Sequence, residues 1–397
     1  MILGPVSYLD CAVFCIFLTP QLLLQVGVFE TISVVIQCLP FLLVQLPFGF
    51  IRERYLSRRA DQPLFVQQAS PFEDFVIRCV RHAFANVDPK VGRVFFSKPV
   101  TLPFLRFRML RHGHFKFPVH WHEHRGENFR GIWIVHNPKK QPDLCLYYAH
   151  GGGFSMGSSY FYLEFLLSWL DLLKKAGYEN PSIFALEYSL VPDNTFPKQL
   201  DEAVAGYEHV LSTVGSPGRV CVGGDSAGGT IVLTLLLHLA NPNYKAGLVK
   251  GYGDRHLGKP AFAVLISPWV TLLSEKHRNT ESDYLDARSL HAYARRYSGD
   301  YAPSDPLVSP GRCKDAVWWH EACPLRGIHL EYGTEEVFAP DIEDLVRFWD
   351  KNGIEVSSRG HRGGIHAWPV ASLFLSDDPK RRLDGLNSIV QEIRSKI

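Results

Sequence analysis

The sequence lacks a strong excess of charge of either sign, and its cysteines include no C-x-x-C pair. Its 397 residues carry 42 basic and 40 acidic side chains, for a formal net charge of +2. Such a chain has no global electrostatic field that would gather nucleic acid. The 8 cysteines include no C-x-x-C spacing typical of zinc sites, and a chain of this length needs no disulfide framework. We therefore expect no nucleic-acid partner, no bound metal and reduced thiols.

Basic residues are absent from residues 1–51, where Asp10 and Glu30 are the only charged side chains. Two apolar stretches, 11–29 and 31–50, are each long enough to cross a hydrocarbon core of about 30 Å. The basic start and the small-residue cleavage site of a signal peptide are also absent. We expect a retained membrane anchor of one or two segments over residues 1–51, and the alternative is a pair of helices buried in the globular core.

A basic cluster follows the apolar region directly, formed by Arg52, Arg54, Arg58 and Arg59. Positive charges beside a membrane segment tend to stay in the cytosol. This favours a cytosolic position for the rest of the chain, although one cluster leaves the sidedness open.

From residue 52 to 397, short apolar runs alternate with helical patterns and show no internal repeat. The runs that read as strands are 131–135, 144–148, 182–188, 219–222, 261–266, 328–332 and 354–357. This alternation predicts a single α/β domain with a mostly parallel sheet covered by helices on both faces. Catalytic groups should then lie at the carboxyl ends of the strands. Residues 52–110 and 272–325 lack clear strands and are expected to form a helical cap.

The first motif that carries chemistry is G-D-S-A-G, formed by Gly224, Asp225, Ser226, Ala227 and Gly228. It lies between an expected strand and an expected helix, where small neighbours allow a tight turn that projects a serine hydroxyl. The N-terminal end of the helix would favour a negative charge at this point. A plain glycine-rich turn is the alternative for the motif taken alone.

The second motif, His150-Gly151-Gly152-Gly153, follows the strand over residues 144–148. Glycines leave backbone N–H groups open to a cavity, so Gly152 and Gly153, together with Ala227, could bind the negative oxygen of a tetrahedral intermediate. A phosphate-binding loop is the alternative, but the run lacks the lysine of a P-loop and the spaced glycines of a dinucleotide site.

A nucleophilic serine needs a general base, and His366 follows the last expected strand, where the third member of a catalytic triad belongs in this kind of sheet. His361 competes with it. A group of upstream histidines is also available, namely His112, His114, His120, His122 and His124. Alternate spacing places the last three on one strand face, where a metal site is conceivable, but a solvated strand face explains the same pattern.

The triad acid should follow the strand over residues 328–332, between the serine and the histidine in sequence. Glu335 fits this position best, and its carboxylate would hold the imidazole tautomer. Glu336 and Asp341 remain alternatives.

With these residues placed, the chain from about Phe65 onward resembles the hormone-sensitive-lipase-like branch of α/β hydrolases. The branch's HGGG loop and GDSAGG turn match residues 150–153 and 224–229, and residues 188–193 resemble its YRLAPE segment. Counterparts also exist for Ser267-Pro268-Trp269 and for residues 305–310. The branch usually has an aspartate in a G-x-D-x-L segment, and here Glu335 occupies that position. The resemblance implies an α/β-hydrolase fold and a serine triad that needs no cofactor.

An apolar N-terminus before such a domain is similar to fungal steryl acetyl hydrolases. We therefore expect a serine carboxylic ester hydrolase that removes a short acyl group, such as acetyl, from a hydrophobic alcohol such as a sterol or a secondary metabolite. The expected location is a membrane, in the endoplasmic reticulum. A non-catalytic small-molecule receptor and an acyltransferase are the rival functions on this fold, and the presence of His366 argues against the receptor.

Overall fold

The computed structural model describes residues 1–245, 248–249 and 257–397. Within these residues the strands form one sheet in the order β1-β2-β4-β3-β5-β6-β7-β8. The strands are β1 His120–Arg125, β2 Arg130–Val135, β3 Leu144–Ala149, β4 Pro181–Leu186, β5 Val220–Asp225, β6 Phe262–Ile266, β7 Ile328–Gly333 and β8 Val356–His361. β2 is antiparallel to both of its neighbours, β1 and β4, and all the other neighbouring pairs are parallel. The predicted, mostly parallel sheet is confirmed.

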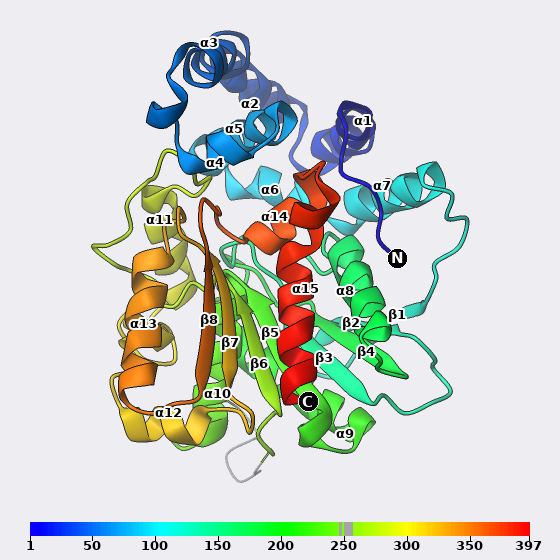
Figure 1. The fold of residues 1–397 in the computed structure, drawn as a ribbon, viewed down its shortest axis with the longest axis vertical. Helices are drawn as coiled ribbons and strands as arrows, with labels where there is room; N and C mark the ends of the chain where they lie inside the picture. The colour runs from blue at the N-terminus through cyan, green and yellow to red at the C-terminus, as the bar shows by residue number, and fades with distance from the viewer. Residues whose placement is uncertain (246–247, 250–256) are drawn as a thin grey trace.

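Helices cover both faces of the sheet and one end of it (Figure 1). They are α1 Tyr8–Gln25, α2 Val28–Pro40, α3 Leu46–Ile51, α4 Leu64–Gln68, α5 Pro71–Asn86, α6 Pro89–Phe95, α7 Lys98–Arg111, α8 Leu163–Lys175, α9 Lys198–Val214, α10 Ala227–Ala240, α11 Ala287–Ser298, α12 Ala316–Ala322, α13 Ala339–Lys351, α14 Trp368–Leu375 and α15 Pro379–Lys396.

The central strand β3 shows why this sheet is covered on both faces. Cys145 and Tyr147 pack into the core shared with α9 and α10, whereas Leu146 and Tyr148 pack into the core shared with α8 and α15. Every residue of β3 is buried. A strand that is buried on both faces reads as a continuous apolar run, which is the pattern in the sequence.

Helices α4 to α7 form a cap over the loops that follow the parallel strands. Arg93 on α6 donates hydrogen bonds to the carbonyl oxygens of Ser155, at 3.0 Å, and Val191. These two residues lie in the loops after β3 and β4. Gln68, at the end of α4, donates to the carbonyl oxygen of Arg362 after β8. The expected cap over residues 52–110 is therefore placed at the carboxyl ends of the strands.

The second part of the expected cap, residues 272–325, divides between two locations. Its helix α11 lies beside α5, next to the cap. Its helix α12 instead packs against α10, where the Trp318 indole donates to the carbonyl oxygen of Leu237 at 2.8 Å. α12 precedes β7 and therefore lies at the amino ends of the strands. The expectation that all of this segment covers the site is wrong for α12.

The first helix, α1, is attached to the body by a buried charge network. The Arg108 guanidinium on α7 donates to both carboxylate oxygens of Glu164, at 2.7 and 2.8 Å, and lies 3.3 Å from Asp10 on α1. Further along α1, Phe14 packs against Phe95 and Phe104. α1 therefore lies along α6 and α7.

A second apolar helix runs from Val28 to Leu56 and includes α2 and α3. Its Phe41 ring stacks on His82 of α5 at 3.8 Å, and Arg54 donates to the carbonyl oxygen of Ala69 at 2.7 Å. This helix and α1 are each long and apolar enough to cross a membrane, a property that signal sequences share. Because only 6% and 11% of their most apolar windows are buried, the alternative of helices buried in the globular core is excluded.

Candidate active site

Ser226 occupies a sharp turn between β5 and α10. Its backbone has φ 52° and ψ −121°, a conformation that a side chain larger than glycine adopts only under strain. The Ser226 N–H donates to the carbonyl oxygen of Ile266 at 3.0 Å, which fixes the turn beside the end of β6. A Cβ atom on Gly228 would lie 2.0 Å from the carbonyl oxygen of Ala149. The turn therefore requires the small residue that the motif supplies.

The triple-glycine loop turns its backbone toward the same corner. Gly152 and Gly153 have φ values of 118° and 59°, which favour glycine. A Cβ atom on Gly152 would lie 2.1 Å from the carbonyl oxygen of Met156. Within the described residues, the N–H groups of Gly152, Gly153 and Ala227 donate no hydrogen bond. Unengaged backbone donors of this kind are what an oxyanion hole requires.

Asp225 ties this loop to the serine turn. Its carboxylate accepts hydrogen bonds from the Gly151 N–H at 2.8 Å and from the hydroxyls of Tyr148 and Tyr162 at 2.7 and 2.6 Å. Burial raises the pKa of Asp225, although these hydrogen bonds oppose the shift. Since the side chain is fully engaged with its neighbours, Asp225 has a supporting role in the loop geometry.

His150 is also a supporting residue. Its Nδ1 lies 2.8 Å from the carbonyl oxygen of Gly151, and its ring stacks on Tyr188 at 4.3 Å. Burial lowers the pKa of His150 to about 4, so the ring is neutral near neutral pH. The side chain therefore packs the base of the oxyanion loop.

His366 lies after β8 with its ring buried, facing a carboxylate. His366 Nδ1 and Glu336 Oε1 are 3.9 Å apart, and neither atom has a hydrogen-bond partner elsewhere in the described chain. Hydrogen bonds between catalytic groups are often long before substrate binds and tighten in the complex. Over the same described residues, the Ser226 hydroxyl and His366 form no hydrogen bond with each other.

The structure corrects the expectation for the acid, because Glu336 and not Glu335 faces His366. The Glu335 carboxylate is half-buried and accepts from the Ser282 hydroxyl at 3.4 Å. Glu336 is buried, and its Oε2 accepts from the Gly333 N–H at 3.0 Å and from the Ser267 hydroxyl at 2.5 Å. The turn after β7 decides which of two adjacent glutamates points inward, and their identical chemistry gives no sequence signal for that choice.

Ser267 also helps to hold the histidine. Its hydroxyl oxygen accepts a hydrogen bond from the N–H of Ala367, the residue after His366, at 2.9 Å. Ser267 thus bridges the Glu336 carboxylate and the histidine loop. In the sequence, Ser267 belongs to a segment that resembles the family's, and no local pattern indicates this role.

The carboxylates around His366 control its protonation. Burial alone would lower the pKa of His366, but Glu336, Asp283 and Asp225 raise it above its ordinary value. Burial also raises the pKa of Glu336. A histidine with these neighbours gains stability as an imidazolium, the form that a general base reaches after it takes a proton.

The remaining candidates lie in other surroundings. Asp341 accepts from the Ser274 hydroxyl at 3.0 Å and lies 3.4 Å from His277. His361 belongs to β8 and stacks on Trp368 at 4.1 Å. Of the upstream histidines, His124 stacks on His209. In the described part of the chain, no group of three His, Cys, Asp or Glu side chains could hold a metal ion.

Comparisons with known proteins agree with this geometry. Residues 146–370, more than half of the chain, match the family described as alpha/beta hydrolase fold. The chain is 29% identical over 240 residues to an acetyl-hydrolase of Streptomyces hygroscopicus, covering 59% of this chain and 71% of the relative. It is 23% identical over 318 residues to a Schizosaccharomyces pombe protein with the provisional name steryl acetyl hydrolase mug81, covering 75% and 79%.

Among solved structures, the fold is similar to that of EstE7, a hormone-sensitive-lipase homologue from a metagenome library. The TM-score is 0.62 at 22% identity, covering 82% of this chain and 98% of the other. The residues that match the family model, 146–370, include both Ser226 and His366. This chain therefore belongs to the alpha/beta hydrolase fold family, in its hormone-sensitive-lipase-like branch of serine ester hydrolases.

Proposed function

We propose that this protein removes a short acyl group, acetyl in the first instance, from a hydrophobic alcohol such as a sterol or a secondary metabolite. The observation that carries the proposal is the arrangement at the end of β5. There, Ser226 occupies a strained turn, the N–H groups of the oxyanion loop are unengaged, and His366 and Glu336 form a buried pair. This combination supports nucleophilic acyl transfer.

The reaction would begin when the Ser226 hydroxyl oxygen bonds to the ester carbonyl carbon and His366 takes the hydroxyl proton. The N–H groups of Gly152, Gly153 and Ala227 would hold the negative oxygen of the tetrahedral intermediate. The intermediate then breaks the ester C–O bond, and the imidazolium gives its proton to the departing alcohol. Water attacks the acyl-enzyme in the same way and releases the carboxylic acid. No step needs a cofactor.

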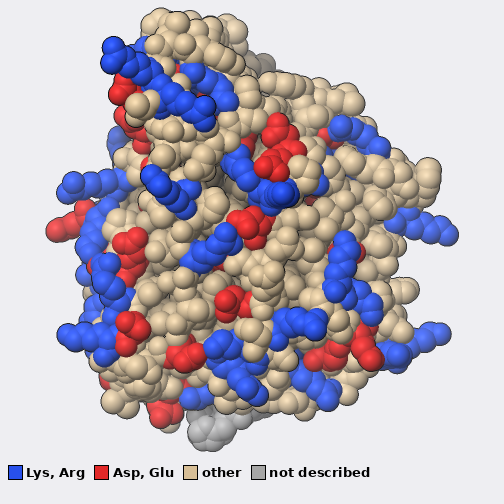
Figure 2. Space-filling model, in the orientation of Figure 1, with Lys and Arg blue, Asp and Glu red and all other residues tan. Residues whose placement is uncertain are grey.

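Support for an acetyl group and a sterol-like alcohol comes from relatives, since one is an acetyl-hydrolase and another is named a steryl acetyl hydrolase. A hydrophobic alcohol also suits the surface of the protein. Most of its exposed large hydrophobic side chains lie between Tyr8 and Leu56. Figure 2 shows that the top of the molecule, over α1 to α3, is mostly uncharged, with basic side chains grouped at one side.

We also propose that this apolar layer attaches the enzyme to a membrane, that of the endoplasmic reticulum. Exposed apolar surface is costly in water and is stabilised in a lipid interface. The same helices lie directly above the cap (Figure 1). An enzyme attached in this way would meet substrates that are dissolved in lipid.

Hydrolysis by the full-length protein in detergent tests the proposal, with p-nitrophenyl acetate as substrate and a fluorophosphonate probe to label the nucleophile. We expect the wild type to hydrolyse the ester and to be labelled, and Ser226→Ala to lose both properties. Ser212→Ala is the matched control, because this exposed hydroxyl on α9 bonds only to its own helix. Equal hydrolysis by the Ser226→Ala variant and the wild type would refute the proposal.

A further inference from the structure

A second buried carboxylate, from Asp283, joins the two loops that carry the acid and the base. Asp283 is 0% exposed. Its Oδ1 accepts the backbone N–H of His366 at 2.9 Å, and its Oδ2 accepts the backbone N–H of Val337 at 2.9 Å. Val337 directly follows Glu336. One side chain therefore fixes the backbone of the histidine and the backbone beside the acid.

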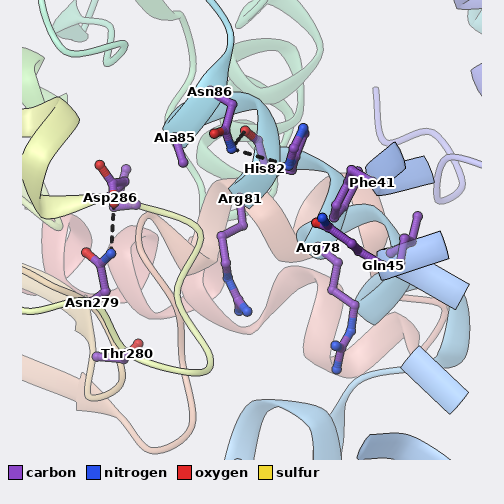
Figure 3. Close-up of a pocket in the computed structure, with 12 residues that line it drawn as sticks. Phe41, Gln45, Arg78, Arg81, His82, Ala85, Asn86, Asn279, Thr280 and Asp286 are labelled. Atoms are coloured by element: carbon purple, nitrogen blue, oxygen red, sulfur yellow. Dashed lines mark hydrogen bonds between the residues drawn. The ribbon is translucent and has the colours of Figure 1, made fainter. Parts of the chain in front are cut away.

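The segment that contains Asp283 is held from the cap by Arg81 on α5. Arg81 Nε donates to the carbonyl oxygen of Asp283, and Arg81 Nη2 donates to that of Glu281, both at 2.7 Å. Figure 3 shows Arg81 extending from α5 into a pocket of about 300 Å³ between α5 and the 279–286 segment. The connection from the cap to the histidine thus consists of consecutive hydrogen bonds.

Arg81 differs from Arg78, the other arginine of α5, in the groups that its guanidinium contacts. Arg78, one turn earlier on α5, pairs with Asp74 at 2.8 Å and Glu53 at 2.9 Å. Arg81 forms no ion pair with any described residue. Burial and the nearby Arg78 lower the pKa of Arg81. A partly buried cation that bonds only to carbonyl oxygens has a desolvation cost, which its contact with the 279–286 segment must offset.

We infer that Asp283 is a positioning residue for His366, and that Arg81 holds it in place from the cap. The inference rests on the proposed function, since it concerns the geometry of the same site. Neither side chain touches the reacting atoms. Both side chains act on the position of the imidazole relative to Ser226 and Glu336. Since Arg81 belongs to α5, the cap would then help to set the geometry of the catalytic residues.

Loss of the Asp283 carboxylate would leave three backbone N–H groups, those of Tyr284, Val337 and His366, without this acceptor and would free the histidine loop to shift. Displacing a catalytic group by about 1 Å can cost on the order of 100-fold in rate. The charged groups that face the His366 ring are Glu336 from the β7–α13 loop, Asp225 from β5 and Asp283 itself. Removing one of these negative charges should also lower the pKa of His366.

The test compares Asp283→Asn and Arg81→Ala with two matched controls in the full-length protein. Asp286→Asn changes an acid of the same segment that caps α11, and Arg78→Ala removes the other guanidinium of α5. We expect both test variants to lower kcat for p-nitrophenyl acetate by about 10- to 100-fold, with KM unchanged. For Asp283→Asn, the acidic limb of the pH profile should move to lower pH, while both controls keep the wild-type values.

Thermal unfolding of all four variants separates positioning from loss of fold. If Asp283→Asn does not fold, Arg81→Ala carries the test, because its side chain lies at the pocket and not in the core. A kcat and a pH profile equal to those of the controls would overturn the inference while wild-type activity upholds the proposed function. A wild type that neither hydrolyses the ester nor reacts with a fluorophosphonate would overturn both.

Discussion

Two adjacent glutamates at the end of β7 have opposite surroundings. Glu336 is buried against His366, whereas the Glu335 carboxylate contacts Ser282 at the edge of the site. Only the first can hold the imidazole tautomer and stabilise its protonated form. The two positions therefore form a natural pair for substitution, with the same chemistry and one residue of separation.

We expect Glu336→Gln to lower kcat by roughly 100- to 10,000-fold, the range over which loss of a triad acid acts. Glu335→Gln should retain wild-type turnover, because its carboxylate does not contact His366. Steady-state hydrolysis of p-nitrophenyl acetate by the two purified variants measures the difference. A greater loss of kcat in Glu335→Gln than in Glu336→Gln would assign the role of triad acid to Glu335.

The protonation of His366 predicts the pH dependence of the reaction. The base must be neutral to take the Ser226 proton, so kcat/KM should fall as the pH decreases through the pKa of His366. Since nearby carboxylates raise this pKa, the acidic limb should lie above the ordinary histidine value of about 6.5. A pH profile of kcat/KM measures it, and a limb below that value would contradict the predicted shift.

At the residue scale, the sequence indicates Ser226, the glycine loop and His366 as candidates, because small residues and a serine at a strand-to-helix turn leave a local pattern. It gives no indication of Asp283, and it favours Glu335 over Glu336. Asp283 acts through its contacts with residues more than fifty positions away in sequence. No local pattern marks a side chain whose partners are backbone N–H groups of distant loops.

At the scale of elements, α1 depends on buried charges for its attachment to the body. The Arg108 side chain is 0% exposed and pairs with both Glu164 and Asp10. Removing Arg108 would leave the buried Glu164 without its ion-pair partner, whereas Asp10 would keep its contact with Arg111. This arrangement explains the presence of a charged residue, Asp10, directly before the apolar stretch over residues 11–29.

We expect Arg108→Met to lower the free energy of unfolding by about 3 to 5 kcal/mol. Arg106→Met is the control, because Arg106 is exposed on the same helix and contacts only the carbonyl oxygen of Phe115 and the Phe117 ring among the described residues. Urea unfolding followed by tryptophan fluorescence measures both. An Arg108→Met variant as stable as the control would show that the network contributes nothing to attachment of α1.

Seven of the eight strands, β2 to β8, were expected from short runs between helical patterns, and their observed bounds differ from the expected ones by a few residues. The edge strand β1 was not among the expected runs, because its sequence is polar and partly exposed. The position of α12 was not predictable in the same way. A segment without strands suggests a cap, but packing of Trp318 against α10 draws this helix to the opposite end of the sheet. The contacts that hold α12 there are long-range, since Trp318 bonds to Leu237 and the buried Trp319 packs against Trp349.

At the scale of the whole molecule, the apolar surface is concentrated at the end that carries the cap. The described residues outside this end expose few large hydrophobic side chains, among them Val317 at 71%. In the Val28–Leu56 helix, Leu43 is 70% exposed and Val44 64% exposed. Such a division between one apolar end and a charged remainder is typical of proteins that dock on a lipid interface.

Charged substitutions in this helix should therefore weaken membrane binding without changing the fold. For Leu42→Asp, Leu43→Asp and Val44→Asp combined, we expect binding to phosphatidylcholine vesicles to fall at least about tenfold, because burying one such side chain is worth about 1.5 kcal/mol or more. The control is Val317→Asp, which places one aspartate on a position at the far end of the molecule that is as exposed as Leu43. Flotation of the full-length protein with vesicles measures binding.

Hydrolysis of p-nitrophenyl acetate in detergent should be unaffected in both variants, since neither site contacts Ser226 or His366. Equal flotation of the triple variant and the control would refute membrane attachment through this helix and leave the chemistry of the site untouched.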